Sequence, residues 1–173
     1  PDEGHIFVDG KEVKIRSPKD SYELGIGMVH QHFKLVDVLT AAENIILGLP
    51  GKGKLDMKKI TEDIQKLVDK YGFEMDLSQK IYEMSVSQKQ TVEIIKMLYR
   101  GARILILDEP TAVLTPQEAD RLFDILRNMR ADGCSIMIIT HKLQEVLALS
   151  DRVAILRKGQ YIDTVETAQA NVQ

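Results

Sequence analysis

The stretch from Arg103 to Thr115 constrains the fold of this chain more than any other. Its four consecutive apolar residues, Ile104 to Leu107, are enough for a strand and too few for a helix. Because they do not alternate with polar residues, they predict a strand buried on both faces, as in a parallel sheet. Pro110 then prevents the ladder of hydrogen bonds from continuing.

Two carboxylates, Asp108 and Glu109, stand where this strand leaves the sheet. In open α/β sheets, ligands bind at the carboxyl ends of the strands. An apolar strand that ends in Asp-Glu resembles a Walker B element, in which the Asp helps to hold Mg²⁺ and the Glu polarises the attacking water. The alternative is a buried strand followed by an acidic turn, and the hexapeptide alone leaves both open.

The segments that follow predict a βαβ unit. Thr115 to Glu118 forms a capping box, with Pro116 at the first position of a helix that ends near Asp132. Cys134 to Ile139 is a second continuous apolar strand. Two strands joined by one helix are parallel neighbours, so His141 is predicted at the same sheet edge as the two carboxylates. Three polar groups at one edge favour a binding site over a structural role.

Length and composition are those of an ordinary globular protein. The 173 residues suffice for one domain, and the net charge of −3, without a basic stripe, argues against nucleic acid as a partner. No apolar run approaches the roughly 20 residues of a membrane span. The single cysteine, Cys134, excludes an internal disulfide, and its apolar surroundings predict a small buried side chain.

The rest of the chain predicts alternating helices and strands. Residues 4 to 15 predict a hairpin around the Asp9-Gly10 turn, and Ser17 caps a short helix that ends at Gly25. Apolar spacing predicts further helices over 41–47, 57–71 and 143–149, and further strands over 26–30, 153–156 and 161–165.

Two local patterns resemble ligand sites, a metal site and a P-loop, but each lacks a residue that such a site requires. His30 and His32 share a face of the predicted strand, but no third metal ligand lies close by. Gly48 to Lys54 matches the first seven positions of a P-loop, but Leu55 replaces the Ser or Thr that reaches Mg²⁺. We therefore interpret this stretch as a surface loop.

The segment from Met84 to Gln90 predicts an anion site. Ser87 and Gln90 form a capping-box pattern before an apolar-periodic helix that ends at Arg100-Gly101. Serine hydroxyls beside the free N–H groups of a helix N-terminus favour an anion such as phosphate. The alternative is a helix whose cap has no further role.

The ordered set of motifs resembles the ATP-binding subunit of an ABC transporter. Gln31 matches the Q-loop, Met84 to Gln88 the LSGGQ signature, Ile104 to Glu109 Walker B, Ala112 to Thr115 the D-loop and His141 the switch histidine. More narrowly, the stretches 28–33, 42–45 and 99–118 resemble the N-terminal nucleotide-binding domain of bacterial importers of simple sugars and nucleosides. The agreement in order and spacing covers nearly the whole chain and is far more specific than any single motif.

This resemblance implies a fold class and a division of the chain. The fold is α/β, a partial P-loop NTPase core of the ABC ATPase type with a mostly parallel sheet and an α-helical subdomain. Residues 1–40 end in the Q-loop, and residues 41–98 form the helical subdomain with the signature. Residues 99–173 form the half of the RecA-like core that carries Walker B, the D-loop and the switch histidine.

The resemblance also implies a role for each motif. Asp108 orients Mg²⁺, Glu109 is the general base for hydrolysis of the γ-phosphate of ATP, and His141 contacts that phosphate. Gln31 helps to hold Mg²⁺ and links it to the transmembrane permease subunits. The residues that close over ATP bound to a second nucleotide-binding domain are Ser85, Val86, Ser87 and Gln88.

The sequence departs from the family pattern in the signature and the D-loop. Val86 and Ser87 replace the two signature glycines, and Ser87 either crowds the phosphate or donates a hydrogen bond to it. Thr115 occupies the aspartate position of the D-loop, where it also serves as a helix cap.

The resemblance begins after the position of Walker A, whose lysine and backbone hold the β- and γ-phosphates. We therefore expect the complete protein to hydrolyse ATP, and this chain alone to bind ATP and Mg²⁺ weakly and to be inactive. Missing sheet neighbours predict an unpaired edge, exposed apolar surface and self-association. The expected location is peripheral, at the cytoplasmic face of the cell membrane, with an external binding protein as an indirect partner.

Two other functions remain open from the sequence. One is an ABC-type ATPase of DNA repair or translation, which the short, cysteine-free segment between Gln31 and the signature and the acidic charge disfavour. The other is a non-catalytic interaction fragment. The sequence does not identify the transported molecule, which binding proteins and membrane subunits select.

Overall fold

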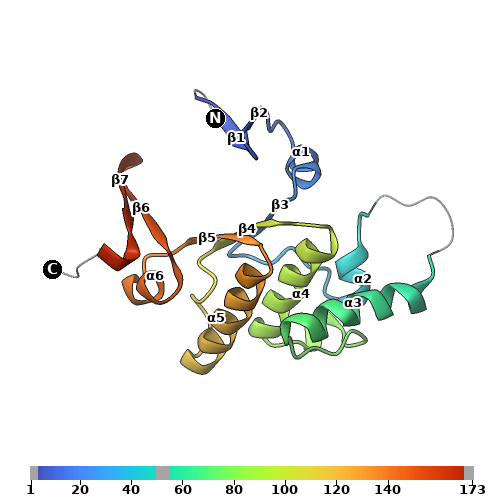
Figure 1. Ribbon diagram of the computed structural model, residues 1–173. Coiled ribbons are helices and arrows are strands. Elements are labelled where there is room, and N and C mark those ends of the chain that lie inside the picture. Colours follow the sequence, from blue (N-terminus) through green and yellow to red (C-terminus); the bar gives the residue numbers. More distant parts are fainter. Residues whose placement is uncertain (1–3, 50–54, 170–173) are drawn as a thin grey trace. The chain divides into compact units, whose positions relative to one another are not determined.

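The computed structural model describes residues 4–49 and 55–169, which fall into two compact units (Figure 1). The first unit extends to Ile138 and the second begins at Ile139. The helices and strands that belong to the first unit or begin in it are β1 (Ile6–Val8), β2 (Lys11–Val13), α1 (Pro18–Glu23), β3 (Ile26–Val29), α2 (Ala41–Ile46), α3 (Met57–Tyr71), the 3₁₀ turn η1 (Ile81–Glu83), α4 (Val86–Tyr99), β4 (Ile104–Asp108), α5 (Pro116–Ala131) and β5 (Ser135–Ile139).

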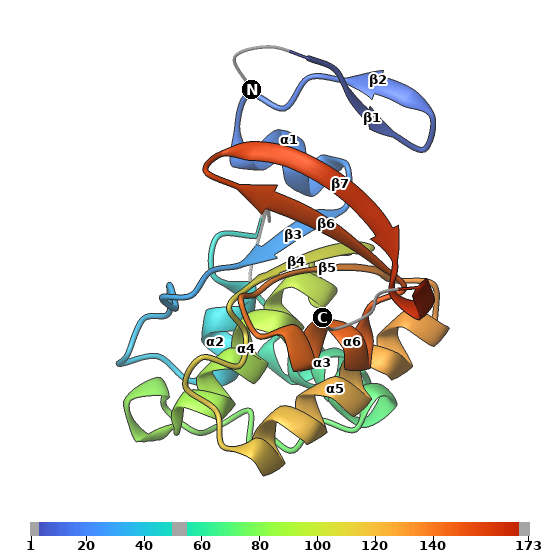
Figure 2. The ribbon, with the colours of Figure 1, turned by 90° about the vertical axis from the view of Figure 1, so that its left-hand side faces the viewer.

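A three-stranded sheet in the order β3-β4-β5 organises the first unit. Strands β3 and β4 run parallel, with Ile26 paired to Ile104 and Val29 paired to Leu107. Helices α4 and α5 lie against one face of this sheet, as the two views in Figures 1 and 2 show. The α/β fold class with a parallel strand pair, predicted from the sequence, is confirmed.

Burial along β4 differs from the prediction. Leu105 and Leu107 are fully buried, but Ile104 and Ile106 on the other face are only half-buried. The expectation of a strand buried on both faces is therefore wrong for β4. The same holds for the other apolar strand, β5, where Met137 is 57% exposed and Ile139 is 46% exposed. The continuous apolar sequence hides an alternation in burial because one face of each strand packs less tightly than the other.

Helix α4 packs directly on β3, and Gly27 makes this close approach possible. A Cβ atom at Gly27 would lie 2.9 Å from Met97 Cβ and 3.0 Å from Ala102 Cβ, both shorter than ordinary contacts. Helices α2 and α3 in turn contact α4. The hydrophobic core of the unit therefore centres on α4, and the helix supplies Val92, Ile94, Ile95 and Met97.

Most of the helix ends that were predicted from capping and stop residues agree with the structure. The capping box of Thr115 and Glu118 begins α5, and its hydrogen bonds hold the pKa of Glu118 below its usual value. Helix α3 is capped by Asp56 and ends at Gly72, whose φ of 76° is the left-handed conformation that favours glycine. The Asp9-Gly10 turn joins β1 and β2 as predicted, with positive φ at both residues.

The second unit contains α6 (Leu143–Leu149), β6 (Arg152–Arg157), β7 (Gln160–Glu166) and a 3₁₀ turn, η2 (Thr167–Gln169). Strands β6 and β7 pair antiparallel around Lys158 and Gly159, which both have positive φ. Residues 170–173 lie outside the described part of the chain.

Two further expectations concern Cys134 and the membrane. Cys134 is half-buried rather than fully buried, because it precedes β5 at the rim of the core, and this partial burial raises the pKa of its thiol. Over the described residues, every helix is too short or too polar to cross a membrane.

A matched pair of leucines tests the assignment of the core. Leu105→Ala removes a fully buried side chain and is expected to lower the free energy of unfolding by about 2–5 kcal/mol. Leu55→Ala removes a side chain that is 61% exposed and is expected to change it by less than about 0.5 kcal/mol. Urea denaturation followed by circular dichroism measures both changes, and equal losses would contradict the assignment.

Candidate functional site

The parallel pairing of β3 and β4 brings two loops to the same edge of the sheet. Val29 ends β3 opposite Leu107, so the chain leaves both strands at nearly the same level. A shallow pocket between the loops is lined by Gln31 from the first and by Asp108 and Glu109 from the second. The structure thus brings together three of the residues that the sequence analysis selected.

The loop after β4 holds Glu109 in an unusual backbone conformation. Its φ is 48°, in the left-handed region that residues other than glycine rarely adopt, at a cost of about 1–2 kcal/mol. The Ala112 amide donates to the Glu109 carbonyl at 3.1 Å and closes a tight turn over Pro110 and Thr111. Strained backbone of this kind concentrates at functional sites, which supports Glu109 as a functional residue.

Gln31 lies beyond the end of β3, with an exposed side chain. His30 and His32 flank it and are also exposed, and neither belongs to the strand on which the sequence analysis placed His30. Within the described residues, no three His, Cys, Asp or Glu side chains lie close enough together to hold a metal ion.

His141 lies in the second unit, just after β5. Next to it, the Lys142 amide donates to the Thr140 hydroxyl at 3.1 Å, and this hydroxyl donates to the Glu145 carboxylate at 3.3 Å. These contacts fix the turn that leads into α6. The predicted convergence of His141 with the two carboxylates stays a prediction.

The signature segment begins α4, but with a different cap from the predicted one. Ser85, not Ser87, is the N-cap: its hydroxyl accepts from the Gln88 amide at 3.2 Å, and the Gln88 side chain accepts from the Ser85 amide at 2.8 Å. The predicted capping box of Ser87 and Gln90 is therefore wrong. Two capping patterns overlap in this sequence, and the Gln90 side chain, which the later pattern requires, instead donates to the Pro110 carbonyl.

Ser87 and Val86 stand in the first turn of α4. The Val86 side chain is exposed, whereas the Ser87 side chain lies near Glu118 on α5 and contributes a little to the lowered pKa of that carboxylate, which is due mainly to its bonds with Thr115. Ser87, Gln88 and Glu118 all line a hollow of about 690 Å³ between α4, α5 and the end of α3.

Sequence reasoning missed the buried polar residues of the first unit, namely Asn44, Gln90, Glu93 and Thr111. Gln90 and Glu93 belong to α4, where they interrupt an otherwise apolar buried surface. The available signal was their position inside the apolar-periodic run, since a polar residue there must be hydrogen-bonded when it is buried.

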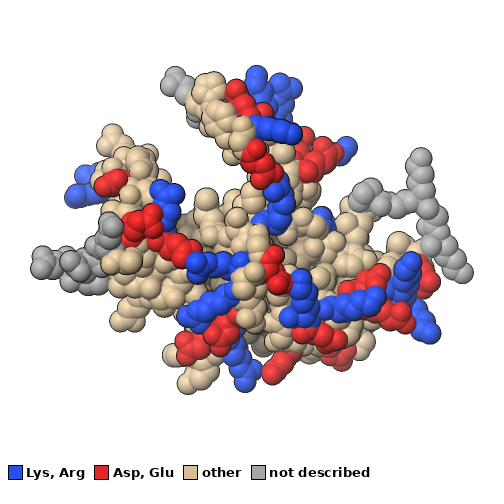
Figure 3. All heavy atoms as spheres, viewed as in Figure 1, with Lys and Arg blue, Asp and Glu red and all other residues tan. Residues whose placement is uncertain are grey.

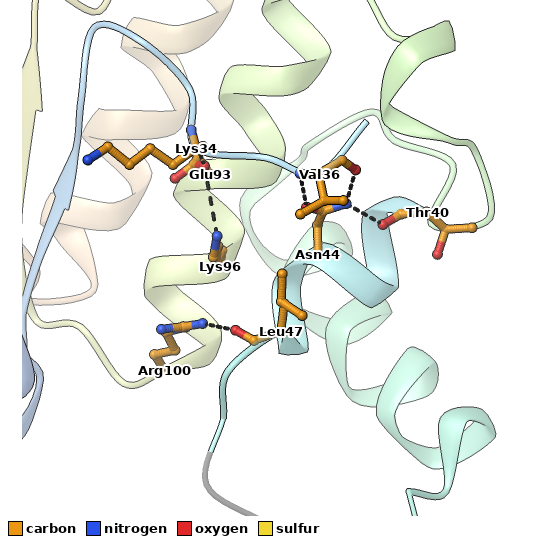
Figure 4. Close-up of polar contacts among 8 residues, drawn as sticks. All are labelled: Lys34, Val36, Thr40, Asn44, Leu47, Glu93, Lys96 and Arg100. Atoms are coloured by element: carbon orange, nitrogen blue, oxygen red, sulfur yellow. Dashed lines mark hydrogen bonds and ion pairs between the residues drawn. The ribbon is translucent and has the colours of Figure 1, made fainter. Parts of the chain in front are cut away.

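Figure 4 shows how these residues hold the loop that follows Gln31. Asn44 accepts from the Val36 amide at 2.8 Å and donates to the carbonyls of Val36 and Thr40. Glu93 accepts from the Lys34 amide at 3.1 Å. Both ends of this segment are therefore attached to buried side chains of neighbouring helices.

The pocket offers oxygen atoms of the kind that Mg²⁺ prefers. Asp108 contributes a carboxylate and Gln31 an amide oxygen, and Mg²⁺ in proteins commonly combines one or two such side chains with water and substrate phosphates. The residues present thus fit a magnesium ion that is shared with a phosphate ligand.

A sequence model of the ABC transporter family matches residues 1–112, which include Gln31, the signature and both carboxylates. The chain belongs to the ABC transporter family. Its described residues therefore form part of an ABC ATPase fold, as the motifs predicted.

Curated relatives fall in the import branch of the family. The chain is 52% identical over 168 residues to the nucleoside import ATP-binding protein NupA of Lactococcus lactis subsp. cremoris, covering 96% of this chain and 33% of that protein. It is 49% identical to the guanosine import ATP-binding protein NupO of Bacillus subtilis, covering 99% and 34%. It is 44% identical to the glucose import ATP-binding protein TsgD13 of Haloferax volcanii, covering 98% and 36%. The chain spans about a third of the length of these relatives.

Solved structures agree in fold. A nucleotide-free ATP-binding cassette from an ABC transporter superposes with a TM-score of 0.82 at 25% identity, covering 95% of this chain and 70% of the other. The cbiO1 protein of Clostridium perfringens, part of the ABC transporter complex cbiONQ, superposes with a TM-score of 0.80 at 26% identity, covering 98% and 68%.

The P-loop-like stretch Gly48 to Lys54, which we interpreted as a surface loop, lies mostly outside the described residues. Only Gly48 and Leu49 belong to the described part, and Gly48 has a φ of 80°. The division of the chain into 1–40, 41–98 and 99–173 likewise stays a prediction.

The two serines of the signature provide a test of the cap. Ser85→Ala is expected to lower the free energy of unfolding by about 1 kcal/mol, because the Gln88 amide loses its acceptor. Ser87→Ala is expected to cost less, since the Ser87 side chain does not cap the helix. Chemical denaturation measures the free energy of unfolding of both variants. A larger decrease for Ser87→Ala than for Ser85→Ala would indicate that Ser87 is the N-cap, as the sequence predicted.

Proposed function

We propose that this chain is part of the nucleotide-binding domain of an ABC importer, whose ATP hydrolysis drives uptake of a sugar or nucleoside. The observation that carries the proposal is the pocket at the ends of β3 and β4, where Gln31, Asp108 and Glu109 come together. The import proteins for nucleosides, guanosine and glucose among the relatives support the choice of cargo class.

In this proposal the residues of the pocket divide the work of hydrolysis. Asp108 and Gln31 hold Mg²⁺, which neutralises phosphate charge when it is bound. Glu109 accepts a proton from the attacking water as general base. His141 does not line this pocket, and its proposed role, contact with the γ-phosphate, rests on its match to the switch histidine alone. Positioning and charge stabilisation supply most of the catalysis in phosphoryl transfer, so these few side chains suffice once ATP is held.

The signature residues act on a second nucleotide-binding domain. Ser85, Val86, Ser87 and Gln88 lie in the cap and first turn of α4, whose exposed N–H groups favour a phosphate. We propose that they close over ATP bound to the partner domain. The backbone N–H groups of this turn are the expected phosphate contact, and the Ser87 hydroxyl is a second candidate.

Exposed apolar side chains near the Gln31 loop support a permease as partner. Val38 is 69% exposed and Tyr82 is 57% exposed. The Tyr82 amide donates to the Asp37 carbonyl at 3.1 Å, which brings the chain at Tyr82 next to the residue that precedes Val38. An exposed apolar patch of this kind is typical of a protein interface. We assign it to the transmembrane subunits, which place the protein at the cytoplasmic face of the membrane, with an external binding protein as an indirect partner.

The charge distribution supports transport over a role on nucleic acid. On the face shown in Figure 3, basic and acidic side chains are interspersed, and the net charge of the chain is −3. A nucleic-acid partner favours a clustered basic surface. An ABC ATPase of DNA repair or translation is therefore the less favoured alternative.

Glu109→Gln tests the general base. In the full-length protein, this change is expected to lower the rate of Mg²⁺-dependent phosphate release by at least about 100-fold, because the amide does not accept the proton of water. ATP binding, measured with a fluorescent analogue, is expected to persist. Glu62→Gln, at an exposed position of α3, is the matched control. Retention of wild-type hydrolysis by Glu109→Gln would reject the assigned role.

Tyr82→Asp tests the docking surface. A charge in the apolar patch is expected to weaken binding to permease-containing vesicles by at least tenfold, a loss of about 1.4 kcal/mol, with ATP hydrolysis in the absence of permease unchanged. Tyr161→Asp, at an equally exposed tyrosine of β7, controls for a general effect of charge. Equal weakening by both variants would argue against a specific surface.

A further inference from the structure

Two buried polar side chains of α4 contact the two loops of the candidate site. Gln90 and Glu93 are 4% and 5% exposed and lie three residues apart, which places them on the same face of the helix. Each makes a hydrogen bond to the backbone of a different loop. Neither side chain has a role in the chemistry proposed above.

Gln90 holds the loop that carries Glu109. Its Nε2 atom donates to the Pro110 carbonyl at 2.7 Å, across 20 residues of sequence. This carbonyl directly follows Glu109, whose backbone is in the left-handed region. Because such a conformation persists only when its surroundings fix it, the buried hydrogen bond helps to keep the Glu109 backbone in place.

Glu93 holds the loop that carries Gln31. One of its carboxylate oxygens accepts from the Lys34 amide at 3.1 Å and lies 3.9 Å from the Lys96 ammonium group (Figure 4). Burial lowers the pKa of Lys96, and the nearby Glu93 carboxylate opposes this change. The pair thus anchors a backbone amide three residues after Gln31.

We propose that Gln90 and Glu93 form a clamp on α4 that sets the spacing between the Gln31 loop and the Glu109 loop, and that both are positioning residues for hydrolysis. This inference rests on the proposed function of the pocket. Ser85 is the N-cap of the same helix, so a movement of the signature segment displaces both loops together. The clamp therefore couples closure of the signature over one ATP to the geometry of the carboxylates at the other.

Substitutions that keep volume but remove one hydrogen bond test the clamp in the full-length protein. Gln90→Met leaves the buried Pro110 carbonyl without this donor, and Glu93→Leu leaves the Lys34 amide without this acceptor. Each is expected to lower kcat for ATP hydrolysis by about 10- to 100-fold while KM for ATP changes less than threefold, because misplacement affects the reaction more than binding. Glu93→Gln keeps an acceptor and is expected to stay within threefold of wild-type kcat.

Gln65→Met and Glu62→Leu, at exposed positions of α3, are the matched controls and are expected to leave kcat unchanged. Hydrogen exchange gives a readout that does not depend on activity. Exchange of the Lys34 amide is expected to accelerate in Glu93→Leu, and exchange of the Ala112 amide in Gln90→Met. Protection elsewhere in α4 reports whether each variant is folded.

The possible results distinguish a failure of the clamp from a failure of the proposed ATPase function. Faster exchange at both loops with unchanged kcat would overturn the positioning role, and so would a low kcat in Glu93→Gln equal to that of Glu93→Leu. Unchanged exchange in both variants would overturn the clamp itself. Absence of ATP hydrolysis by the wild-type protein would contradict the proposed function and its positioning residues, and the exchange rates would still decide whether the contacts hold the loops.

Discussion

The parallel pairing of β3 with β4 is the interaction on which the candidate site depends. It aligns Val29 with Leu107 and so brings the loops with Gln31 and with Asp108 to one edge of the sheet. The pairing is held from one side by α4, which approaches β3 closely because Gly27 has no side chain. A side chain at this position would separate the helix from the strand, and the loops of the site would lose their common support.

Helix α4 has three structural roles in this chain. Its apolar residues form the centre of the core, its N-terminus carries the signature, and its two buried polar residues reach the loops of the pocket. Buried hydrogen bonds fix geometry more strongly than apolar contacts, because an unpaired buried group is costly. If Gln90 and Glu93 hold the two loops as proposed, a small displacement of α4 moves these loops with it.

Structure that depends on residues close together in the sequence, such as the bounds of a helix, could be predicted. Structure that depends on contacts between distant residues could not. The bounds of α3, residues 57–71, were predicted correctly because apolar spacing along a helix is a local signal. The cap of α4 was misplaced because Ser85 and Ser87 offer competing local patterns, and the Gln90 side chain of the later pattern is bonded instead to the Pro110 carbonyl, 20 residues away. The pocket itself was predicted in part, since the strand ends are visible in the sequence, but the support from Gln90 depends on how the helix packs.

We propose that the pocket belongs to an ATP-hydrolysing site of an importer. The most direct test is phosphate release by the full-length protein, together with its permease in vesicles, as ATP and Mg²⁺ are varied. The account predicts release that saturates with ATP and disappears when Mg²⁺ is removed. Release no greater than that of protein-free vesicles, at saturating ATP and Mg²⁺, would contradict it.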